Sequence, residues 1–217
     1  MDMQWFVSIL YWMACYVLAW IVSIVCYVTN PIVVLFCDKD GELPGFLSLW
    51  QTWDNSCNPS DVVHNKQLPS WLLYDFDAHY VERIVETDEL SQVNRKRWAT
   101  ECINDEWTLA ERFRRYVCRV YWLTRNCAYG FNFWLFGRLV TPHVKVVENW
   151  HGGTLAYEAI DAETFAWMYK STALICTVGS YVIRWNTLIG WKINTDADVD
   201  TQAMIAVRIA PAIDKIN

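Results

Sequence analysis

The sequence predicts an α+β protein that begins with a transmembrane helix. The evidence is a long uncharged apolar run at the N-terminus, helical spacing of apolar residues between 78 and 128, and a period of two after residue 130. In chain order we expect a membrane anchor over 1–37, a loop-rich neck over 38–77, a helical segment over 78–128 and an antiparallel β segment over 129–217. The last two segments are expected to form one body.

The predicted anchor contains almost no charge. Apart from Asp2, the first 37 residues carry no charged side chain, and the run from Trp5 to Val28 is almost entirely apolar and aromatic. Its 24 residues would form a helix of about 36 Å, which exceeds a hydrocarbon core of ~30 Å. Asn30-Pro31 predicts a kink or break at Asn30, near the end of this helix.

Two alternatives to a membrane span fit the N-terminal run less well. A signal peptide is disfavoured because the leader has no basic residue and no A-x-A cleavage site follows the apolar run. A buried core helix is disfavoured because the rest of the chain is too small to surround it on every side. We therefore expect a single-pass membrane protein.

The distribution of charge and cysteine indicates orientation and compartment. All 18 Lys and Arg residues follow the span, beginning at Lys39, so the positive-inside rule favours a cytoplasmic C-terminal body. The eight cysteines show no CxxC pair and no tight disulfide framework, which favours a reducing compartment. A net charge of -6 argues against a general nucleic-acid binder, whereas 14 Trp and 11 Tyr favour a body that lies against a lipid or protein surface.

The segment over 78–128 lacks proline and glycine and mixes charged with apolar residues, which predicts one or two amphipathic helices with a break near Thr87 to Ser91. Arg112, Arg115 and Arg119 would lie on one side of the second helix, next to its apolar stripe. These three guanidinium groups are candidates for contact with anionic lipid headgroups, and the favoured alternative is an ordinary solvated face.

The last segment shows strand periodicity. Odd positions from Tyr181 to Ile193 are mostly apolar or aromatic, and similar alternation occurs over 165–169 and 203–209. A polar turn at 194–200 would join the last two strands, so we expect an antiparallel meander with one apolar face toward a core. A second membrane span over 172–191 is disfavoured because Arg184 lies inside it.

Three stretches together resemble an uncharacterised family of tailed-bacteriophage proteins. They are LPGFLSLWQTWDNS (43–56), RYVCRVYWLTRNCAYGF (115–131) and the late IGWKI (189–193). Members of that family share a similar W-L-x-R-N-x-x-Y-G-F core and a G-W-K strand, and have no established activity. The resemblance covers most of the chain after residue 40. It implies a viral source and a bacterial host membrane, and it carries over no catalytic residue.

The best candidate for metal chemistry is Asp75, Asp77 and His79, with Asp54, Asp61 and His64 upstream. On a strand, positions 75, 77 and 79 would point to one side and could hold a divalent metal. The favoured alternative is a solvated turn before a helix, with Asp75 or Asp77 at its N-cap. We find no P-loop, H-E-x-x-H, G-x-S-x-G or G-x-G-x-x-G motif, so no catalytic residue and no cofactor is expected.

These observations favour a viral accessory protein in the host inner membrane, which acts by binding a host or viral membrane component. The second hypothesis is a virion structural or genome-ejection component. A membrane-tethered hydrolase or metal-dependent enzyme is the third. The sequence defines no oligomeric state.

Overall fold

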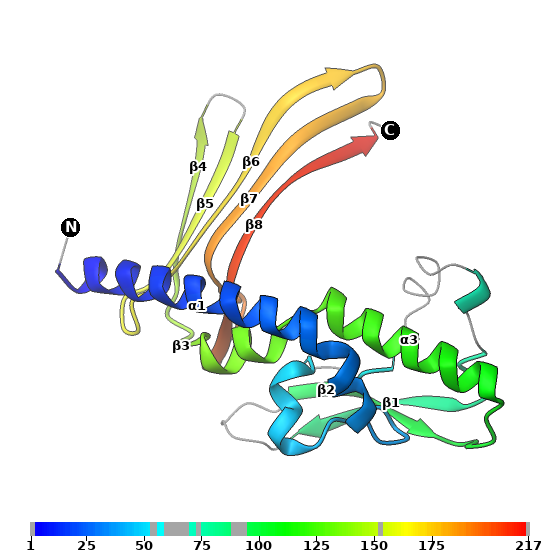
Figure 1. Ribbon diagram of the computed structural model, residues 1–217. Helices are drawn as coiled ribbons and strands as arrows, with labels where there is room; N and C mark the ends of the chain where they lie inside the picture. Colours follow the sequence, from blue (N-terminus) through cyan, green and yellow to red (C-terminus); the bar gives the residue numbers. More distant parts are fainter. Residues whose placement is uncertain are drawn as a thin grey trace. The chain divides into compact units, whose positions relative to one another are not determined.

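The computed structural model describes residues 3–52, 56–58, 70–72, 75–87, 95–151 and 154–215. The chain is an α+β protein (Figure 1) that divides into two compact units, which we describe separately. Unit 1 comprises Met1–Leu18 with Asn132–Asn217, and unit 2 comprises Ala19–Phe131. The division therefore falls within the first helix, at Leu18, and not at the end of the apolar run.

Helix α1 (Met3–Val33) contains no charged residue and continues without a break into a short 3-10 turn, η1 (Val34–Phe36). The break expected at Asn30 is wrong, because the helix continues through Asn30 and Pro31 to Val33. Together α1 and η1 are long and apolar enough to cross a membrane by length and composition. They form one such helix within the described ranges.

Unit 1 is built on a six-stranded antiparallel sheet with strand order β3-β8-β7-β6-β5-β4 (Figure 1). Its strands are β3 (Arg138–Val140), β4 (Lys145–His151), β5 (Thr154–Asp161), β6 (Ala166–Val178), β7 (Tyr181–Lys192) and β8 (Thr201–Lys215). Strands β4 to β8 are neighbours in chain order, which confirms the expected meander. The stretch considered as a second membrane span forms most of the β6–β7 hairpin instead.

The apolar alternation of β7 is present, but only one end of it reaches a core. Trp191 is fully buried and Ile193 is nearly so, whereas Trp185 is 42% exposed and Tyr181 is also exposed. Figure 1 shows the reason, since β6, β7 and β8 extend well beyond β4 and β5. The expectation that the whole odd-numbered face is buried is therefore wrong for the distal half of the strand.

Gly190 permits a close approach of β7 to β6. Its φ angle is +119°, and a Cβ atom at this position would lie 2.3 Å from the carbonyl oxygen of Trp167. Any side chain would force the two strands apart, so the residue must be glycine. The next residue is Trp191, whose indole N–H donates a hydrogen bond to the carbonyl oxygen of Phe136.

Unit 2 contains a β-hairpin where helix was expected. Strands β1 (Tyr80–Thr87) and β2 (Arg95–Cys102) pair in an antiparallel register, so the helical prediction is wrong for this part of 78–128. The spacing of charged residues between apolar ones is compatible with an amphipathic helix, but the Val, Ile and Thr residues of YVERIVET favour a strand. The expected break at 87–91 falls almost entirely outside the described residues.

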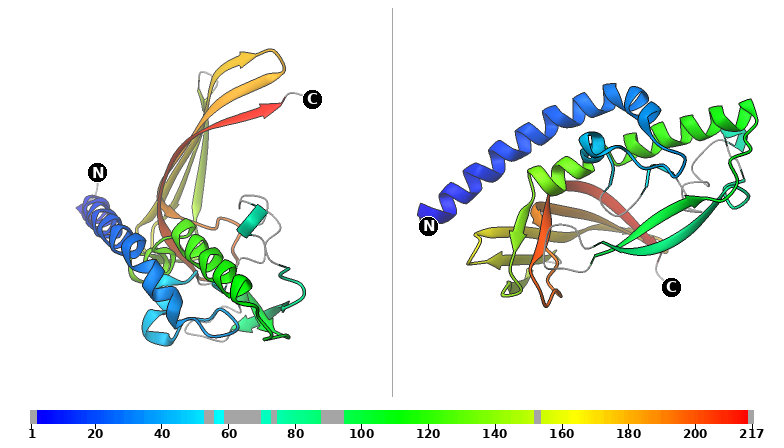
Figure 2. Two further views of the ribbon diagram at one scale, coloured as in Figure 1. Left: turned by 45° about the vertical axis from the view of Figure 1, so that its right-hand side comes forward. Right: turned by 90° about the horizontal axis from the view of Figure 1, so that it is seen from below.

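Helix α3 (Leu109–Arg125) confirms the second predicted helix. It begins with a capping box, in which the Thr108 hydroxyl accepts from the N–H of Glu111 and the Glu111 carboxylate accepts from the N–H of Thr108. Figure 2 shows α3 beside the second half of α1, where the Tyr116 hydroxyl donates a 2.9 Å hydrogen bond to the carbonyl oxygen of Pro31. The apolar core of this contact consists of Val33, Val34, Leu43, Cys57 and Leu123.

The described part of the neck contains short turns. Within 38–77 the described residues form two 3-10 helices, η2 (Gly45–Trp50) and η3 (Ser70–Leu72). A π-helical turn, η4 (Phe131–Leu135), follows α3. Gln51 holds the start of this neck because its side chain accepts from the N–H of Leu43 and donates to Glu42.

Candidate functional site

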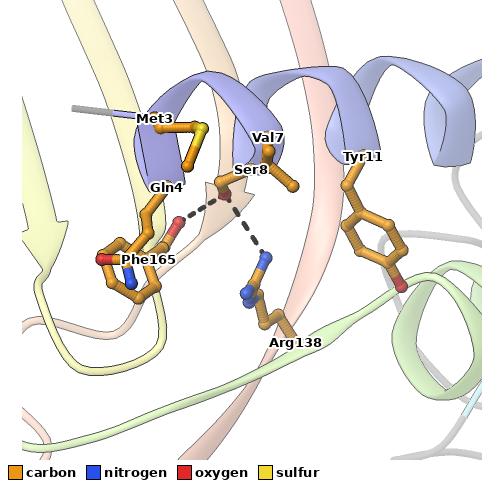
Figure 3. A pocket seen from close by; sticks show the side chains of 7 residues that line it. All are labelled: Met3, Gln4, Val7, Ser8, Tyr11, Arg138 and Phe165. Atoms are coloured by element: carbon orange, nitrogen blue, oxygen red, sulfur yellow. Dashed lines mark hydrogen bonds between the residues drawn. The ribbon is translucent and has the colours of Figure 1, made fainter. Parts of the chain in front are cut away.

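An apolar cleft of about 620 Å³ lies beside the first half of α1, within unit 1 (Figure 3). Its walls come from one face of α1 and from two residues of the sheet region. They are Met3, Gln4, Val7 and Tyr11 on one side and Arg138 and Phe165 on the other. The helical residues are three or four positions apart, which is the spacing that places side chains on one helix face.

Ser8 connects the two walls. It is 4% exposed, and its hydroxyl donates a 2.7 Å hydrogen bond to the carbonyl oxygen of Phe165. The Ser8 hydroxyl oxygen in turn accepts a weaker hydrogen bond from the Arg138 guanidinium at 3.4 Å. Figure 3 shows the hydroxyl between these two groups.

Phe165 adopts an unusual backbone conformation. Its φ angle is +56°, in the left-handed region that costs a bulky residue about 1–3 kcal/mol. The tight turn between β5 and β6 imposes it, and Asp161 holds that turn by accepting from the N–H of Glu163 at 2.9 Å and from the Thr164 hydroxyl at 2.8 Å. The Phe165 ring in turn packs edge-on against Trp5, with ring centroids 5.4 Å apart.

The Asp161 carboxyl is kept ionised by its hydrogen bonds. Burial alone would raise its pKa, but hydrogen bonds from the N–H of Thr141, the Thr164 hydroxyl and the N–H of Glu163 outweigh burial and lower the pKa from its ordinary value. These bonds occupy both carboxylate oxygens. Asp161 therefore serves the turn and does not pair directly with Arg138.

Arg138 is the single charged residue among the described residues that line the cleft. Burial lowers the pKa of its guanidinium from the ordinary value, although an arginine still remains charged at neutral pH. The guanidinium carbon lies 5.1 Å from the ring centroid of Trp191 and 5.7 Å from that of Tyr11, so two aromatic faces hold the cation. Within the described ranges, no carboxylate lies at ion-pair distance from it.

The arrangement supports binding better than acid–base chemistry. The described lining residues offer one guanidinium, the hydroxyls of Ser8 and Tyr11, the amide of Gln4 and an otherwise apolar surface. Among these residues no nucleophile is paired with a general base. Over the part of the chain that the structure describes, no group of three or more His, Cys, Asp or Glu residues comes together that could hold a metal ion.

The candidate metal ligands lie in unit 2, in a turn before β1. Asp75 and Asp77 are exposed, and the Asp75 carboxylate accepts from the N–H of Ala78. His79 is buried, with its ring stacked on Trp107 at 3.7 Å and its Nδ1 atom 3.0 Å from the carbonyl oxygen of Asn104. The strand geometry considered for these residues is therefore wrong, and the turn leads into a strand and not a helix. Asp54, Asp61 and His64 lie outside the described residues.

The three arginines of α3 have different environments. Arg119 is 5% exposed, and its guanidinium donates to the Asn58 side chain at 2.8 Å and to the carbonyl oxygens of Asp38 and Lys39. The hydrogen-bond donors of Arg119 are therefore satisfied inside unit 2. Arg115 lies over the Trp107 ring at 4.3 Å, and Arg112 is exposed. Headgroup contact by Arg112 stays a prediction.

Sequence reasoning missed the cleft. Arg138 follows FNFWLFG as a lone cation after an apolar run, which was the available signal. The G-W-K motif was noted, and it supplies Trp191, one of the aromatic faces beside Arg138. Ser8 and Phe165 gave no signal, because their roles depend on a contact between residues far apart in the chain.

Fold and site define an α+β protein with a membrane-length apolar helix and a cleft that presents one cation. The chain belongs to a family of unknown function, DUF7338, which matches residues 3–217. No curated protein and no solved structure matches the chain.

Proposed function

We propose that this protein is anchored in a membrane by α1 and acts there by binding another membrane component. The observation that carries the proposal is the exposed surface of α1, which is apolar along its whole length and contains no charged residue. Exposed positions include Phe6, Val17, Trp20, Ile24, Val28 and Ile32.

Burial supports a membrane helix over a core helix. Only 22% of the most apolar 18-residue window is buried against the rest of the chain. A soluble monomer rarely exposes a continuous apolar patch of this length, because each such residue left in water forgoes the free energy of burial. Lipid is the environment that would cover this surface without a polar partner.

We place the protein in the host inner membrane as a single-pass protein of viral origin, with a cytoplasmic body. The viral source rests on the resemblance of residues 43–56, 115–131 and 189–193 to tailed-bacteriophage proteins. The orientation rests on the location of every Lys and Arg after the helix.

Binding to a partner is supported by the distal part of the sheet. Trp185 pairs with Pro211, and Ile183 pairs with Ile213, so these residues share one face of β7 and β8. Trp185 and Ile213 are exposed, and with Tyr181 they form an apolar surface. Surfaces of this kind mark contacts with proteins or membranes. The proposed partner is a host or viral membrane protein.

Fractionation tests this proposal. The full chain is produced in bacterial cells, and inner membrane, outer membrane and cytosol are separated and probed, together with purified particles of the virus that encodes it. We expect the chain in the inner membrane and not in the particles. Recovery in the cytosol would contradict the anchor, and recovery in particles would favour a virion component.

A further inference from the structure

We infer that the cleft beside the first half of α1 binds one anionic phospholipid, with its phosphate on Arg138 and an acyl chain along the apolar helix face. This inference rests on the proposed function, because membrane anchoring brings α1 into contact with lipid. It goes further by naming the ligand and the residue that selects it.

The charge of the site favours an anion. Among the described residues, Arg138 is the only charged one that lines the cleft, and it makes one long hydrogen bond to Ser8 and lies near two aromatic ring faces. A guanidinium has five N–H donors, so several of them stay available to a phosphate oxygen pair.

The remaining lining favours a ligand with an apolar chain. Met3, Val7 and Phe165 contribute hydrocarbon surface, and the volume of about 620 Å³ falls in the range of small-molecule sites. Free phosphate would use the cation alone and leave this apolar surface without contact. A phospholipid satisfies both parts of the site.

A second, smaller cleft on α1 provides an internal comparison. Its volume is about 280 Å³, and it is lined by Trp5, Ile9 and Trp167 together with the acidic Glu158. A carboxylate at this position repels a phosphate. An anionic lipid should therefore select the cleft of Arg138.

Native mass spectrometry of the full chain in neutral detergent tests the inference. Phosphatidylglycerol, phosphatidylcholine and inorganic phosphate are added in separate titrations. We expect one phosphatidylglycerol to bind, with phosphatidylcholine binding at least about tenfold more weakly. Both lipids carry the phosphate, but the trimethylammonium group of phosphatidylcholine cancels the net negative charge and is repelled by the guanidinium of Arg138. Inorganic phosphate should not compete. Equal binding of the two lipids would overturn the inference, and competition by inorganic phosphate would reassign the cleft to a free anion.

Two pairs of variants assign the binding to the cleft. Arg138→Gln should weaken phosphatidylglycerol binding about tenfold or more, whereas Arg208→Gln, which removes an exposed charge from β8, should not. Val7→Trp should block the cleft without altering Arg138, whereas Val17→Trp makes the same change at an exposed position of α1 outside the cleft lining. If Val7→Trp and a folded Arg138→Gln both bind like wild type, the site is not this cleft.

The outcome is separable from that of the proposed function. Arg138→Gln should stay in the membrane fraction, because α1 is unchanged. If the wild-type chain stays in the membrane fraction but shows no preference for phosphatidylglycerol, the lipid site is contradicted and the anchor is not. If the chain fails to enter membranes but binds phosphatidylglycerol in detergent, membrane anchoring by α1 is contradicted and the lipid site in the cleft is supported.

Discussion

A 2.7 Å hydrogen bond joins the Ser8 hydroxyl to the carbonyl oxygen of Phe165, across 157 residues of sequence. The left-handed conformation of Phe165 belongs to the turn that places this carbonyl against α1. The bond therefore ties the apolar helix to the β5–β6 turn within unit 1, and it fixes one wall of the cleft.

Ser8→Ala should lower the free energy of unfolding by about 1 kcal/mol, because it leaves the Phe165 carbonyl oxygen without this donor. Thermal unfolding of the full chain in detergent measures the change. Ser23→Ala is the matched control, since the Ser23 hydroxyl donates only to Ala19 within its own helix. An equal effect of both substitutions would show that the long-range bond adds nothing.

Trp191→Ala should destabilise unit 1 by about 3–5 kcal/mol, because this fully buried side chain contacts Trp167 and Arg138. Trp185→Ala, on the same face of the same strand, should cost clearly less because Trp185 is exposed. Chemical denaturation of both variants compares them. Similar losses would mean that the distal sheet face is covered in the isolated protein.

Acid should weaken the β5–β6 turn through Asp161. Its pKa is lowered in the folded protein, so its contribution to stability is present above the pKa of the unfolded chain and is lost as pH falls through the folded pKa. The melting temperature of wild type should therefore fall in acid more steeply than that of Asp161→Asn. Parallel curves for the two proteins would exclude Asp161 as a source of the acid sensitivity.

Cys37 should be alkylated at lower pH than Cys118. The Cys57 thiol donates a hydrogen bond that lowers the pKa of Cys37, whereas burial raises the pKa of Cys118 to about 11. The thiolate is the reactive form, so labelling with iodoacetamide across a pH series, read by mass spectrometry, should separate the two sites. Cys57→Ser should shift Cys37 labelling to higher pH. An unchanged profile would contradict the thiol–thiol contact.

Sequence periodicity predicted the elements whose pattern is local. The uncharged run defined α1, the apolar stripe defined α3, and alternation defined β7. It failed where two periods compete, as in Tyr80–Thr87, where charges spaced between apolar residues fit a helix while β-branched residues formed a strand.

The site depends on long-range contacts that no periodicity reports. Arg119 was expected on a surface because it shares one side of the helix with Arg112 and Arg115. It is buried instead, and its guanidinium donates hydrogen bonds to the carbonyl oxygens of Asp38 and Lys39. Arg138 was overlooked because a single cation on a short edge strand has no pattern. Only the tertiary contacts with Tyr11 and Trp191 give it a distinct environment.

The most direct test of the central claim is alkaline carbonate extraction of membranes from cells that produce the full chain or Leu18→Arg. Leu18 lies near the middle of α1 and its side chain is 51% exposed. It should cost about 2.5–3.5 kcal/mol on insertion scales. Val199→Arg, at an exposed position between β7 and β8, controls for the added charge. The account predicts that wild type and Val199→Arg stay in the membrane pellet while Leu18→Arg is released, and equal retention of all three proteins would contradict anchoring by α1.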